Sequence, residues 1–444
     1  MHQPRVPDPG SACRNIMNRR VPFAVLSGAV VGVALFGAAL QAQDQKPGAV
    51  GALMPDEEMG EYRRTEAGGV LAALQKSLET GAVRWKYDER QGYLPEVLAA
   101  LKLPPESQVL VFSKTSPHRR HITPQNPRAL YFNDRAAVAY VPGTEVIDLA
   151  AADPKLGVVF YSLEQKPGGQ PRLFRDDRCL ECHATSKTLN VPGLLVRSFL
   201  TGDDGDVSAL GGKPMVTHRT PFAERWGGYY VTGTQGPMAH LGNLFGAEAQ
   251  TRHQREPGKN GNITDLKPFL DLANYPAKQS DIVALMTLDH QAHMQNLLTL
   301  LNTEATRALR DNGSLRAVYP VVESVLQYLL FTDEAPLVSA VTGATDFPKV
   351  LQRTVPKDVQ GRSLAEFDLK TRLFRYPCSY MIYSPSFDAL PAGAKKHVYR
   401  RLWEILSGQD TTAEYARLTS ASRRDLREFL SATKPDLPAY WRLE

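Results

Sequence analysis

The pattern of hydrophobic and polar positions changes three times along the chain. Apolar residues recur at helical spacing over 69–79 and over 94–103, and the second run ends at Pro104-Pro105. From residue 105 to 176 the pattern becomes one of short runs rich in Val, Ala, Tyr and Phe, separated by Pro, Gly, Asn and Asp. Such runs are typical of strands joined by turns. The expected strands are 109–112, 129–132, 137–141, 145–148 and 157–161.

The second half of the chain begins with a segment of different character. Residues 177–260 are rich in glycine and have no regular period, which predicts an irregular segment. Helical periodicity then returns over 281–310, 315–331, 395–406 and 413–432. Ser280 is the expected N-cap of the first of these helices, and Gly313 follows its end.

These patterns predict an α+β fold with a fixed order of parts. We expect a flexible arm with short helices over 43–104 and a small β-rich domain over 105–176. The irregular Gly-rich segment over 177–260 and a mainly helical domain over 261–444 follow.

Residues 1–42 have the layout of a secretory signal peptide. Arg19 and Arg20 precede an apolar run over 21–40, and Ala42 offers a small residue at the cleavage point. The run is also about long enough to remain as a membrane anchor. We expect cleavage after Ala42, and therefore no stable membrane span in the mature chain. Met17 lies just before the basic pair and is an alternative start of translation.

The charge balance gives no reason to expect nucleic acid as a partner. The whole chain has 52 Lys and Arg against 47 Asp and Glu, a net charge of +5. Four of the arginines and one aspartate lie within residues 1–42, so the mature chain has 48 basic and 46 acidic side chains. It therefore lacks the basic excess typical of proteins that bind nucleic acid.

The most specific pattern in the sequence is Cys179-Leu180-Glu181-Cys182-His183. Two thiols at this spacing can each bond one vinyl group of the same haem, and the adjacent imidazole then lies under the iron as an axial ligand. A zinc site would need a second ligand pair, and a thioredoxin-like dithiol would need a βαβ setting. We therefore expect one covalent haem c. Such attachment takes place outside the bacterial cytoplasm, which agrees with a periplasmic or otherwise exported protein.

On these residues the chain resembles the c-type cytochromes, and its layout is similar to that of large exported bacterial proteins that contain a cytochrome c domain. The resemblance implies that the carbonyl of Pro192, in Asn190-Val191-Pro192-Gly193-Leu194, accepts the Nδ1 proton of His183. The alternative is an ordinary Pro-Gly turn. Residues 43–178 precede the motif, which departs from the small single-haem members of the family.

The second axial ligand of the iron has several candidates. His240 and His218, in the Gly-rich segment, are the leading pair, and His290 and Met294, on the helix expected after residue 280, are weaker alternatives. A histidine at any of these positions could equally lie on a surface or in a turn, and the methionine could pack in the core. Asp289 beside His290 could instead form an acid–base pair in an enzyme.

Three other features of the sequence have more than one possible role. Arg225, beside Trp226, could pair with a haem propionate or pack in an exposed turn. The basic turn over 118–121 is expected to be solvated surface, or a docking site for an acidic electron-transfer partner. Cys378 is expected to be a buried free thiol.

Three functions are consistent with these patterns. The first is a periplasmic electron carrier that exchanges electrons with a redox partner protein or a small-molecule donor or acceptor. The second is a monohaem oxidoreductase or peroxidase-like enzyme with an open distal haem site, suggested by the length of the chain. The third is a haem-bearing scaffold or sensor. We expect the carrier first, because the motif implies redox chemistry but not a substrate.

Overall fold

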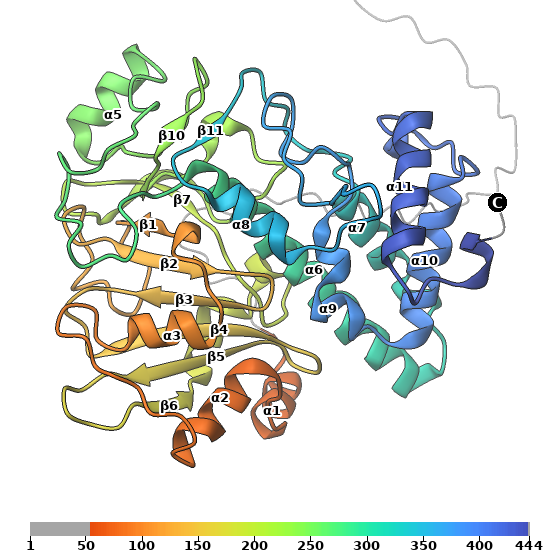
Figure 1. Cartoon of the computed structure of the whole chain (residues 1–444), viewed down its shortest axis with the longest axis horizontal. Coiled ribbons are helices and arrows are strands. Elements are labelled where there is room, and N and C mark those ends of the chain that lie inside the picture. The colour runs from red at the N-terminus through yellow and green to blue at the C-terminus, as the bar shows by residue number, and fades with distance from the viewer. Residues whose placement is uncertain (1–53, 443–444) are drawn as a thin grey trace, which may run out of the picture. The chain divides into compact units, whose positions relative to one another are not determined.

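The computed structural model describes residues 54–442. The predicted signal peptide over 1–42, its cleavage point at Ala42 and the alternative start at Met17 lie outside the described residues. A β-rich part precedes a mainly helical part, which confirms the α+β class (Figure 1). Over residues 54–442, none of the helices is both long enough and apolar enough to cross a membrane.

An antiparallel sheet dominates the first part of the structure. Over residues 54–442 its seven strands lie in the order β6-β5-β4-β3-β2-β1-β9 (Figure 1). Strands β1 to β6 follow one another along the chain, as expected for apolar runs separated by turn residues. The last strand comes from the Gly-rich segment and pairs with β1, with Tyr230 opposite Leu110. The bounds are β1 Val109–Val111, β2 Arg128–Phe132, β3 Ala136–Tyr140, β4 Val146–Asp153, β5 Gly157–Glu164, β6 Arg172–Arg175 and β9 Tyr229–Tyr230.

Two small antiparallel pairs lie outside this sheet. In the Gly-rich segment β7 (Ser198–Thr201) pairs with β8 (Val207–Lys213), so this segment has more regular structure than its sequence predicts. Strand β10 (Gly233–Thr234) pairs with β11 (Thr342–Gly343), which joins parts of the chain that are far apart in sequence.

The helices of the described chain follow the expected runs with several additions. Helix α2 has the bounds expected for the first helical run, and α3 ends three residues before its run does. The bounds are α1 Asp56–Arg64, α2 Gly69–Glu79, α3 Leu94–Ala100, α4 Leu180–His183, α5 Gly246–Arg255, α6 Ile282–Asn312, α7 Tyr319–Leu329, α8 Phe347–Thr354, α9 Pro385–Asp388, α10 Ala392–Leu406 and α11 Ser420–Thr433.

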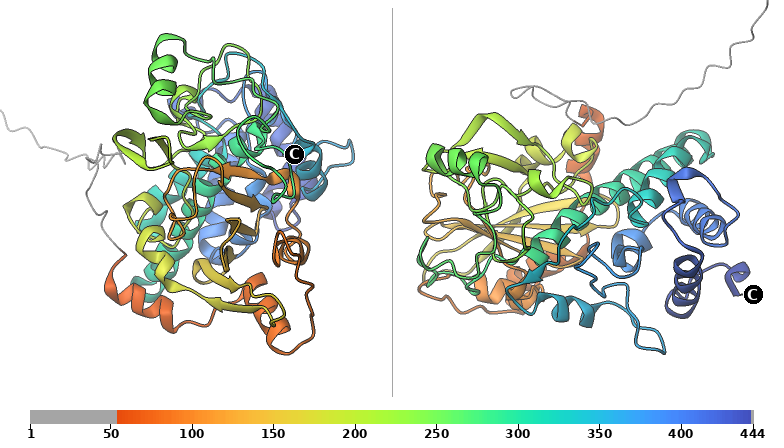
Figure 2. Two further views of the ribbon diagram at one scale, coloured as in Figure 1. Left: turned by 90° about the vertical axis from the view of Figure 1, so that its left-hand side faces the viewer. Right: turned by 90° about the horizontal axis from the view of Figure 1, so that it is seen from above.

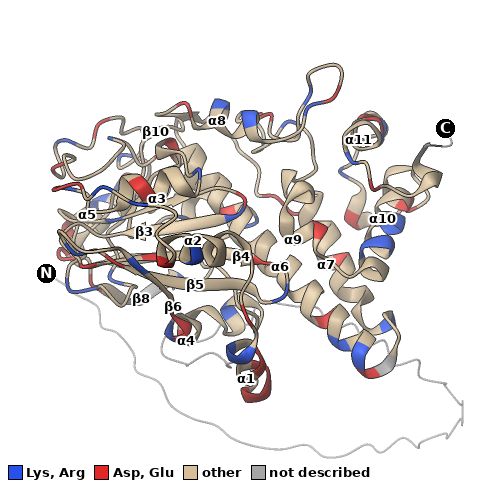
Figure 3. Cartoon of the chain, turned by 60° about the horizontal axis from the view of Figure 1, so that its bottom comes forward, with Lys and Arg blue, Asp and Glu red and all other residues tan. Residues whose placement is uncertain are grey.

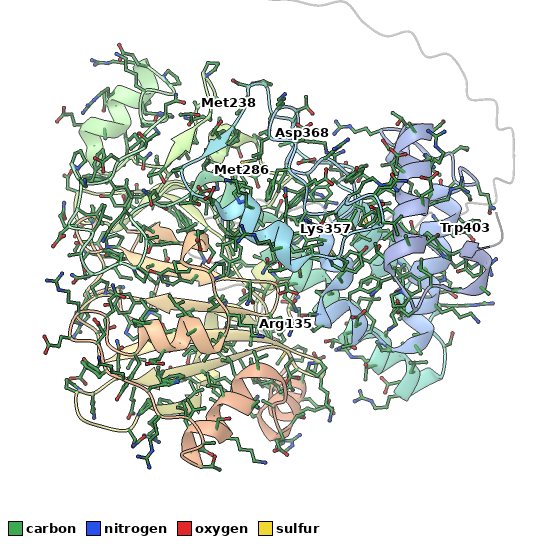
Figure 4. All side chains as sticks on the ribbon, viewed as in Figure 1. Arg135, Met238, Met286, Lys357, Asp368 and Trp403 are labelled. Atoms are coloured by element: carbon green, nitrogen blue, oxygen red, sulfur yellow. The ribbon has the colours of Figure 1, made fainter. Side chains whose placement is uncertain are left out.

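The sheet separates two hydrophobic clusters. Because side chains alternate across a strand, Val109 and Val111 of β1 belong to the cluster that contains α6, whereas Leu110 belongs to the cluster that contains α2 and α3. Met286 of α6 lies within the first cluster and is 2% exposed (Figure 4). The first cluster therefore joins one face of the sheet to the helical part of the chain.

Helix α6 is the central element of the helical part. It packs against β5 of the sheet and against α7, and α7 in turn contacts α10 (Figure 2 shows these helices from two further directions). At its far end Arg307 forms an ion pair with Glu58 in the first turn of α1. Figure 3 shows the acidic residues of α1 in red. Side chains along α6 can therefore reach both the sheet and the other helices.

The expected cap of α6 is wrong by one residue. The carboxylate of Asp281 accepts hydrogen bonds from the N–H groups of Val283 and Ala284, at 2.8 and 3.0 Å. Ser280 cannot take this role because its hydroxyl donates to the carbonyl of Tyr230 and accepts from Leu110, thereby bracing β9 against β1. At the other end Gly313 is the C-cap with φ of 62°, as expected for a helix that ends at glycine.

Candidate functional site

The motif Cys179-Leu180-Glu181-Cys182-His183 lies on a short helical turn directly after β6. Asp176 begins the turn, because its carboxylate accepts a hydrogen bond from the N–H of Arg178 and pairs with the Arg178 guanidinium at 2.6 Å. Leu180 is buried in the cluster beside the sheet, whereas Cys182 is exposed and Cys179 is half-buried. The burial of Leu180 thus anchors the turn and leaves Cys182 on its accessible side, while Cys179 packs partly against the cluster.

Among residues 54–442, neither thiol of the motif forms a disulfide. Burial raises the pKa of the Cys179 thiol to about 12, whereas the attacking thiol of a redox dithiol has a lowered pKa. Among residues 54–442, no group of three or more His, Cys, Asp or Glu side chains is arranged to hold a metal ion. The zinc and dithiol alternatives therefore gain no support from the geometry.

The imidazole of His183 is held by the loop that follows the motif. Its Nδ1 atom lies 2.9 Å from the carbonyl oxygen of Gly193, and the N–H of Gly193 donates to the carbonyl of His183 at 2.8 Å. When Nδ1–H donates to this carbonyl, Nε2 keeps its lone pair, which is the form that binds a metal. The ring also packs beside Phe160 of β5, with centroids 4.9 Å apart.

The role that the resemblance implied for Pro192 is wrong by one residue. The acceptor for His183 is the carbonyl of Gly193. The carbonyl of Pro192 faces the start of β5 instead, where a Cβ on Gly157 would come within 3.2 Å of it. Pro192 therefore shapes the loop but does not bind the imidazole.

Helix α6 fixes the position of this loop. The amide of Asn296 bonds to both backbone groups of Leu194: its Oδ1 accepts from the N–H at 2.7 Å, and its Nδ2 donates to the carbonyl at 2.8 Å. A Cβ on Gly193 would lie only 2.4 Å from Asn296 Oδ1. Glycine is therefore required next to the amide, and the carbonyl that orients His183 is held from α6.

Three charged side chains lie around His183. Arg197 and Arg128 act on the imidazole as positive charges, and Asp148 of β4 acts as a negative one. Although part of the ring remains accessible, burial is the main effect and lowers the pKa of His183 to about 4. The imidazole is therefore neutral at neutral pH, as a metal ligand must be.

The two arginines beside His183 lack an acidic partner. Over residues 54–442, neither Arg128 nor Arg197 forms an ion pair, and Nε of Arg128 is buried without a hydrogen bond. The nearby carboxylate of Asp148 pairs with His118 at 3.1 Å, which raises the pKa of that histidine. A guanidinium matches a carboxylate with two parallel hydrogen bonds. Both arginines are thus suited to the propionates of a haem.

The candidate distal ligands lie apart from His183. Within the described chain, the hydrogen bonds, ring contacts and charge interactions of His183 include none of them. Met294 is fully buried in the hydrophobic cluster of α6, as expected for core packing. The other candidates are His218, His240 and His290, which belong to a buried polar cluster around Tyr328 and Trp226.

Two of these histidines bond to each other. Nδ1 of His218 lies 2.8 Å from Nδ1 of His290, and Nε2 of His290 lies 2.6 Å from Oγ of Ser379. The ring of Tyr328 stacks on both, at centroid distances of 3.9 Å and 5.2 Å. Because both nitrogens of His290 are engaged, this side chain is not free to bind iron.

His240 packs beside Trp226. Its Nδ1 accepts a hydrogen bond from the N–H of Gly242 at 3.0 Å, and its ring centroid is 5.4 Å from that of Trp226. Burial lowers the pKa of His240 to about 3. It is thus a neutral, buried histidine rather than a residue of a surface turn.

Arg225 and Asp289 form a buried ion pair. Oδ2 of Asp289 lies 3.4 Å from Nη1 of Arg225 and accepts a hydrogen bond from Nε1 of Trp226 at 2.9 Å. Arg225 is 3% exposed, so it is not a residue of an exposed turn, and its guanidinium already pairs with the carboxylate of Asp289. Burial raises the pKa of Asp289 to about 7. Its carboxylate bonds to these two side chains and not to the His290 imidazole, so the expected acid–base pair is not formed.

Two minor expectations are confirmed. Arg119, Arg120 and His121 of the basic turn are exposed, although His118 pairs with Asp148 as described above. Cys378 is completely buried and is a free thiol.

Sequence reasoning missed the residues that the fold brings to the motif. Arg128 lies at the start of a strand, Arg197 lies in an irregular segment, and Asn296 lies on a helix. Each has an ordinary local context, so only the pairing of the strands and the position of α6 reveal it. Comparisons with protein-family models, curated proteins and solved structures find no match to this chain.

Proposed function

We propose that the chain is an exported c-type cytochrome that binds one haem covalently and transfers electrons in the periplasm. Cys179 and Cys182 attach the haem, and His183 is the proximal ligand of its iron. The observation that carries the proposal is the hydrogen bond between His183 Nδ1 and the carbonyl of Gly193. It fixes the ring and its tautomer, and so directs Nε2 to a ligand role.

The surroundings of the motif fit this group. Haem supplies an iron that alternates between the ferric and ferrous states. Arg128 and Arg197 pair with its propionates, since they are positive and have no acidic partner in the described chain. The exposed thiol of Cys182 places the attachment turn at the surface, where electron exchange with a redox partner is fastest.

The partner we propose is an acidic electron-transfer protein. The exposed Arg119 and Arg120 belong to the basic turn, which is tied to β4 by the pair between His118 and Asp148. Asp148 also lies close enough to Cys179 of the motif to raise the pKa of its thiol. The basic turn therefore lies near the attachment site, where complementary charge increases the association rate.

A second candidate function is a monohaem oxidoreductase with an open distal site. It is favoured by the positions of the expected distal ligands. His290 uses both nitrogens within the buried cluster, and Nδ1 of His240 accepts a hydrogen bond from Gly242, so that its Nε2 carries the proton and not a free lone pair. The distal position would then be filled by water or a substrate.

Optical spectra of the purified holoprotein test both functions. We expect a covalent c-type haem that is reduced and reoxidised reversibly. Carbon monoxide added to the ferrous protein separates the two candidates: an unchanged low-spin spectrum supports the carrier, and a rapid shift supports the open site. A His183→Ala variant should lose the low-spin spectrum, whereas a His253→Ala variant should keep it. Absence of bound haem in the wild type would contradict both functions.

A further inference from the structure

A group of buried nitrogen atoms near Tyr328 has no hydrogen-bond partner in the described part of the chain. They are Nε2 of His218, Nδ1 of His293, and Nε and Nη2 of Arg219. Native proteins satisfy nearly all of their buried polar atoms, with protein groups, water or a ligand. Four such atoms on three neighbouring side chains therefore indicate that something else binds there.

The three side chains converge on one ring. The centroid of Tyr328 lies 3.9 Å from that of His218 and 4.7 Å from that of His293, and 5.1 Å from Cζ of Arg219. They come from different elements: His218 and Arg219 from the loop before residue 222, His293 from α6, and Tyr328 from α7. The tertiary fold, and not local sequence, therefore creates the group.

Arg219 has the weakest ion pair of the arginines in this region. Arg219 and Arg225 both enter it, but the buried carboxylate of Asp289 already pairs with Arg225 and accepts from Trp226. Nη2 of Arg219 lies 3.5 Å from the carboxylate of Asp333, whose side chain is 63% exposed. An ion pair this exposed contributes little. The guanidinium of Arg219 is therefore only weakly paired and keeps most of its charge for a ligand.

Two aromatic residues beside the group have strained backbones. Trp226 has φ of 69° and Phe331 has φ of 55°, a region that bulky side chains rarely adopt. Such strain costs on the order of 1–3 kcal/mol per residue and is concentrated at functional sites. The ring of Phe331 stacks on His218 at 4.7 Å and also lines a surface pocket of about 240 Å³.

The hydrogen bonds behind His218 determine which proton it presents. Oγ of Ser379 accepts the N–H of Met381, so its own proton is available for Nε2 of His290. His290 then donates from Nδ1 to Nδ1 of His218. In this arrangement His218 carries its proton on the unpartnered Nε2, and so offers an N–H donor to the space beside Arg219.

We propose that Arg219, His218 and His293 bind a small inorganic oxyanion. The guanidinium supplies the charge and two N–H donors, and the imidazoles supply further donors, which matches the acceptors of a phosphate, sulfate or nitrate. The anion enters along Arg219, whose side chain is 36% exposed. This site lies apart from the contacts of the haem-attachment motif and does not depend on the haem.

Calorimetric titration of the purified holoprotein with phosphate, sulfate and nitrate, at constant ionic strength set with chloride, tests the proposal. At least one oxyanion should bind to the wild type with one-to-one stoichiometry. Arg219→Gln should weaken binding about tenfold or more, because charge-assisted hydrogen bonds are lost. Arg316→Gln, which makes the same charge change at an exposed position near α7, should leave the affinity within about twofold.

A second variant distinguishes a binding role from a structural one. Asp333→Asn removes the carboxylate that competes for Arg219, so the anion should bind more tightly. A merely structural role for Arg219 would not predict this gain. If Arg219→Gln fails to fold, Asp333→Asn and Arg219→Lys carry the test. The proposal would be overturned if the wild type binds no oxyanion. It would also be overturned if the Arg219 and Asp333 variants bind the oxyanion with the same affinity as the wild type.

Discussion

Gly193 and His183 are joined by two hydrogen bonds in opposite directions. The carbonyl of Gly193 binds Nδ1 of the imidazole, and its N–H binds the carbonyl of His183. One residue thus fixes both the backbone and the ring of the proposed iron ligand. Asn296 of α6 holds the next residue, Leu194, at both of its backbone groups. The orientation of the imidazole therefore depends on a helix more than a hundred positions away in sequence.

Replacing Gly193 by alanine should disturb the site. The new Cβ would lie 2.4 Å from Asn296 Oδ1, so the loop must shift and strain the core. We expect a loss of about 1–3 kcal/mol in the free energy of unfolding, measured by denaturant titration, and a changed reduction potential. The matched control is Gly169→Ala, where the nearest atom is 3.5 Å away and the backbone is not left-handed. Equal stability of the two variants would count against the role of Gly193.

Removing the amide of Asn296 should loosen the same loop. Asn296→Ala leaves the N–H and the carbonyl of Leu194 without partners, which costs about 1–3 kcal/mol because the two groups are half-buried. Hydrogen exchange at residues 193–195 should become faster. Asn302→Ala on the same helix is the control, because its amide makes one exposed bond to the carbonyl of Pro154. Unchanged exchange in the Asn296 variant would show that α6 does not position the loop.

Stability should fall as the pH drops below about 6.5. Burial lowers the pKa of His240, His290 and His293 to about 3, whereas each has its ordinary pKa in the unfolded chain. Between pH 6.5 and 3 the unfolded state thus binds more protons, and each histidine contributes a slope of up to about 1.4 kcal/mol per pH unit. Asp289, with a raised pKa of about 7, binds its proton more tightly in the folded state and so has the opposite effect on stability. The three histidines together have the larger effect.

One substitution checks this pH dependence. His240→Asn keeps an acceptor for the N–H of Gly242 and removes one titrating group, along with its weaker repulsion from His253. The slope of unfolding free energy against pH should decrease by up to about 1.4 kcal/mol per unit below pH 6.5. Denaturant titrations at several pH values measure it. A slope equal to that of the wild type would mean that His240 is not held neutral.

The potential of the haem should respond to Arg128. Arg128→Gln removes a positive charge beside His183, so the ferric state gains relative stability. The reduction potential should fall by roughly tens of millivolts, as measured by spectroelectrochemistry. Arg135→Gln, at an exposed position in the turn between β2 and β3 (Figure 4), should leave the potential nearly unchanged. Equal reduction potentials in the two variants would show that Arg128 does not interact with the haem.

Much of the fold follows from local sequence. Helix α6 was predictable because its apolar positions keep a helical period and Gly313 ends it, and the strands β1 to β5 were predictable because turn residues separate their apolar runs. Strand β9 was not, since two residues have no period of their own and pair with β1 only through the tertiary fold. The cap of α6 was placed at Ser280 because serine and aspartate are equally good caps, and only the contact with Tyr230 decides between them.

Part of the candidate site was likewise predictable from local sequence, and part depends on the tertiary fold. The spacing of Cys179, Cys182 and His183 is local and directs attention to the turn after β6. The acceptor for the imidazole was predicted at Pro192 from resemblance, but the direction of a carbonyl depends on the loop conformation that Asn296 imposes. Arg128 could not be found from sequence, because strand pairing alone brings it to the motif.

The most direct test of the central claim is the intact mass of the full chain produced in a bacterium that exports and matures c-type cytochromes. We predict that the wild type carries one covalently bound haem and that Cys378→Ser, which alters a buried thiol outside the motif, carries it too. Cys179→Ser and Cys182→Ser should each lose most of it, and the double variant should lose all. Wild-type chain without the added mass of a haem, or attachment that survives loss of both thiols, would contradict the account.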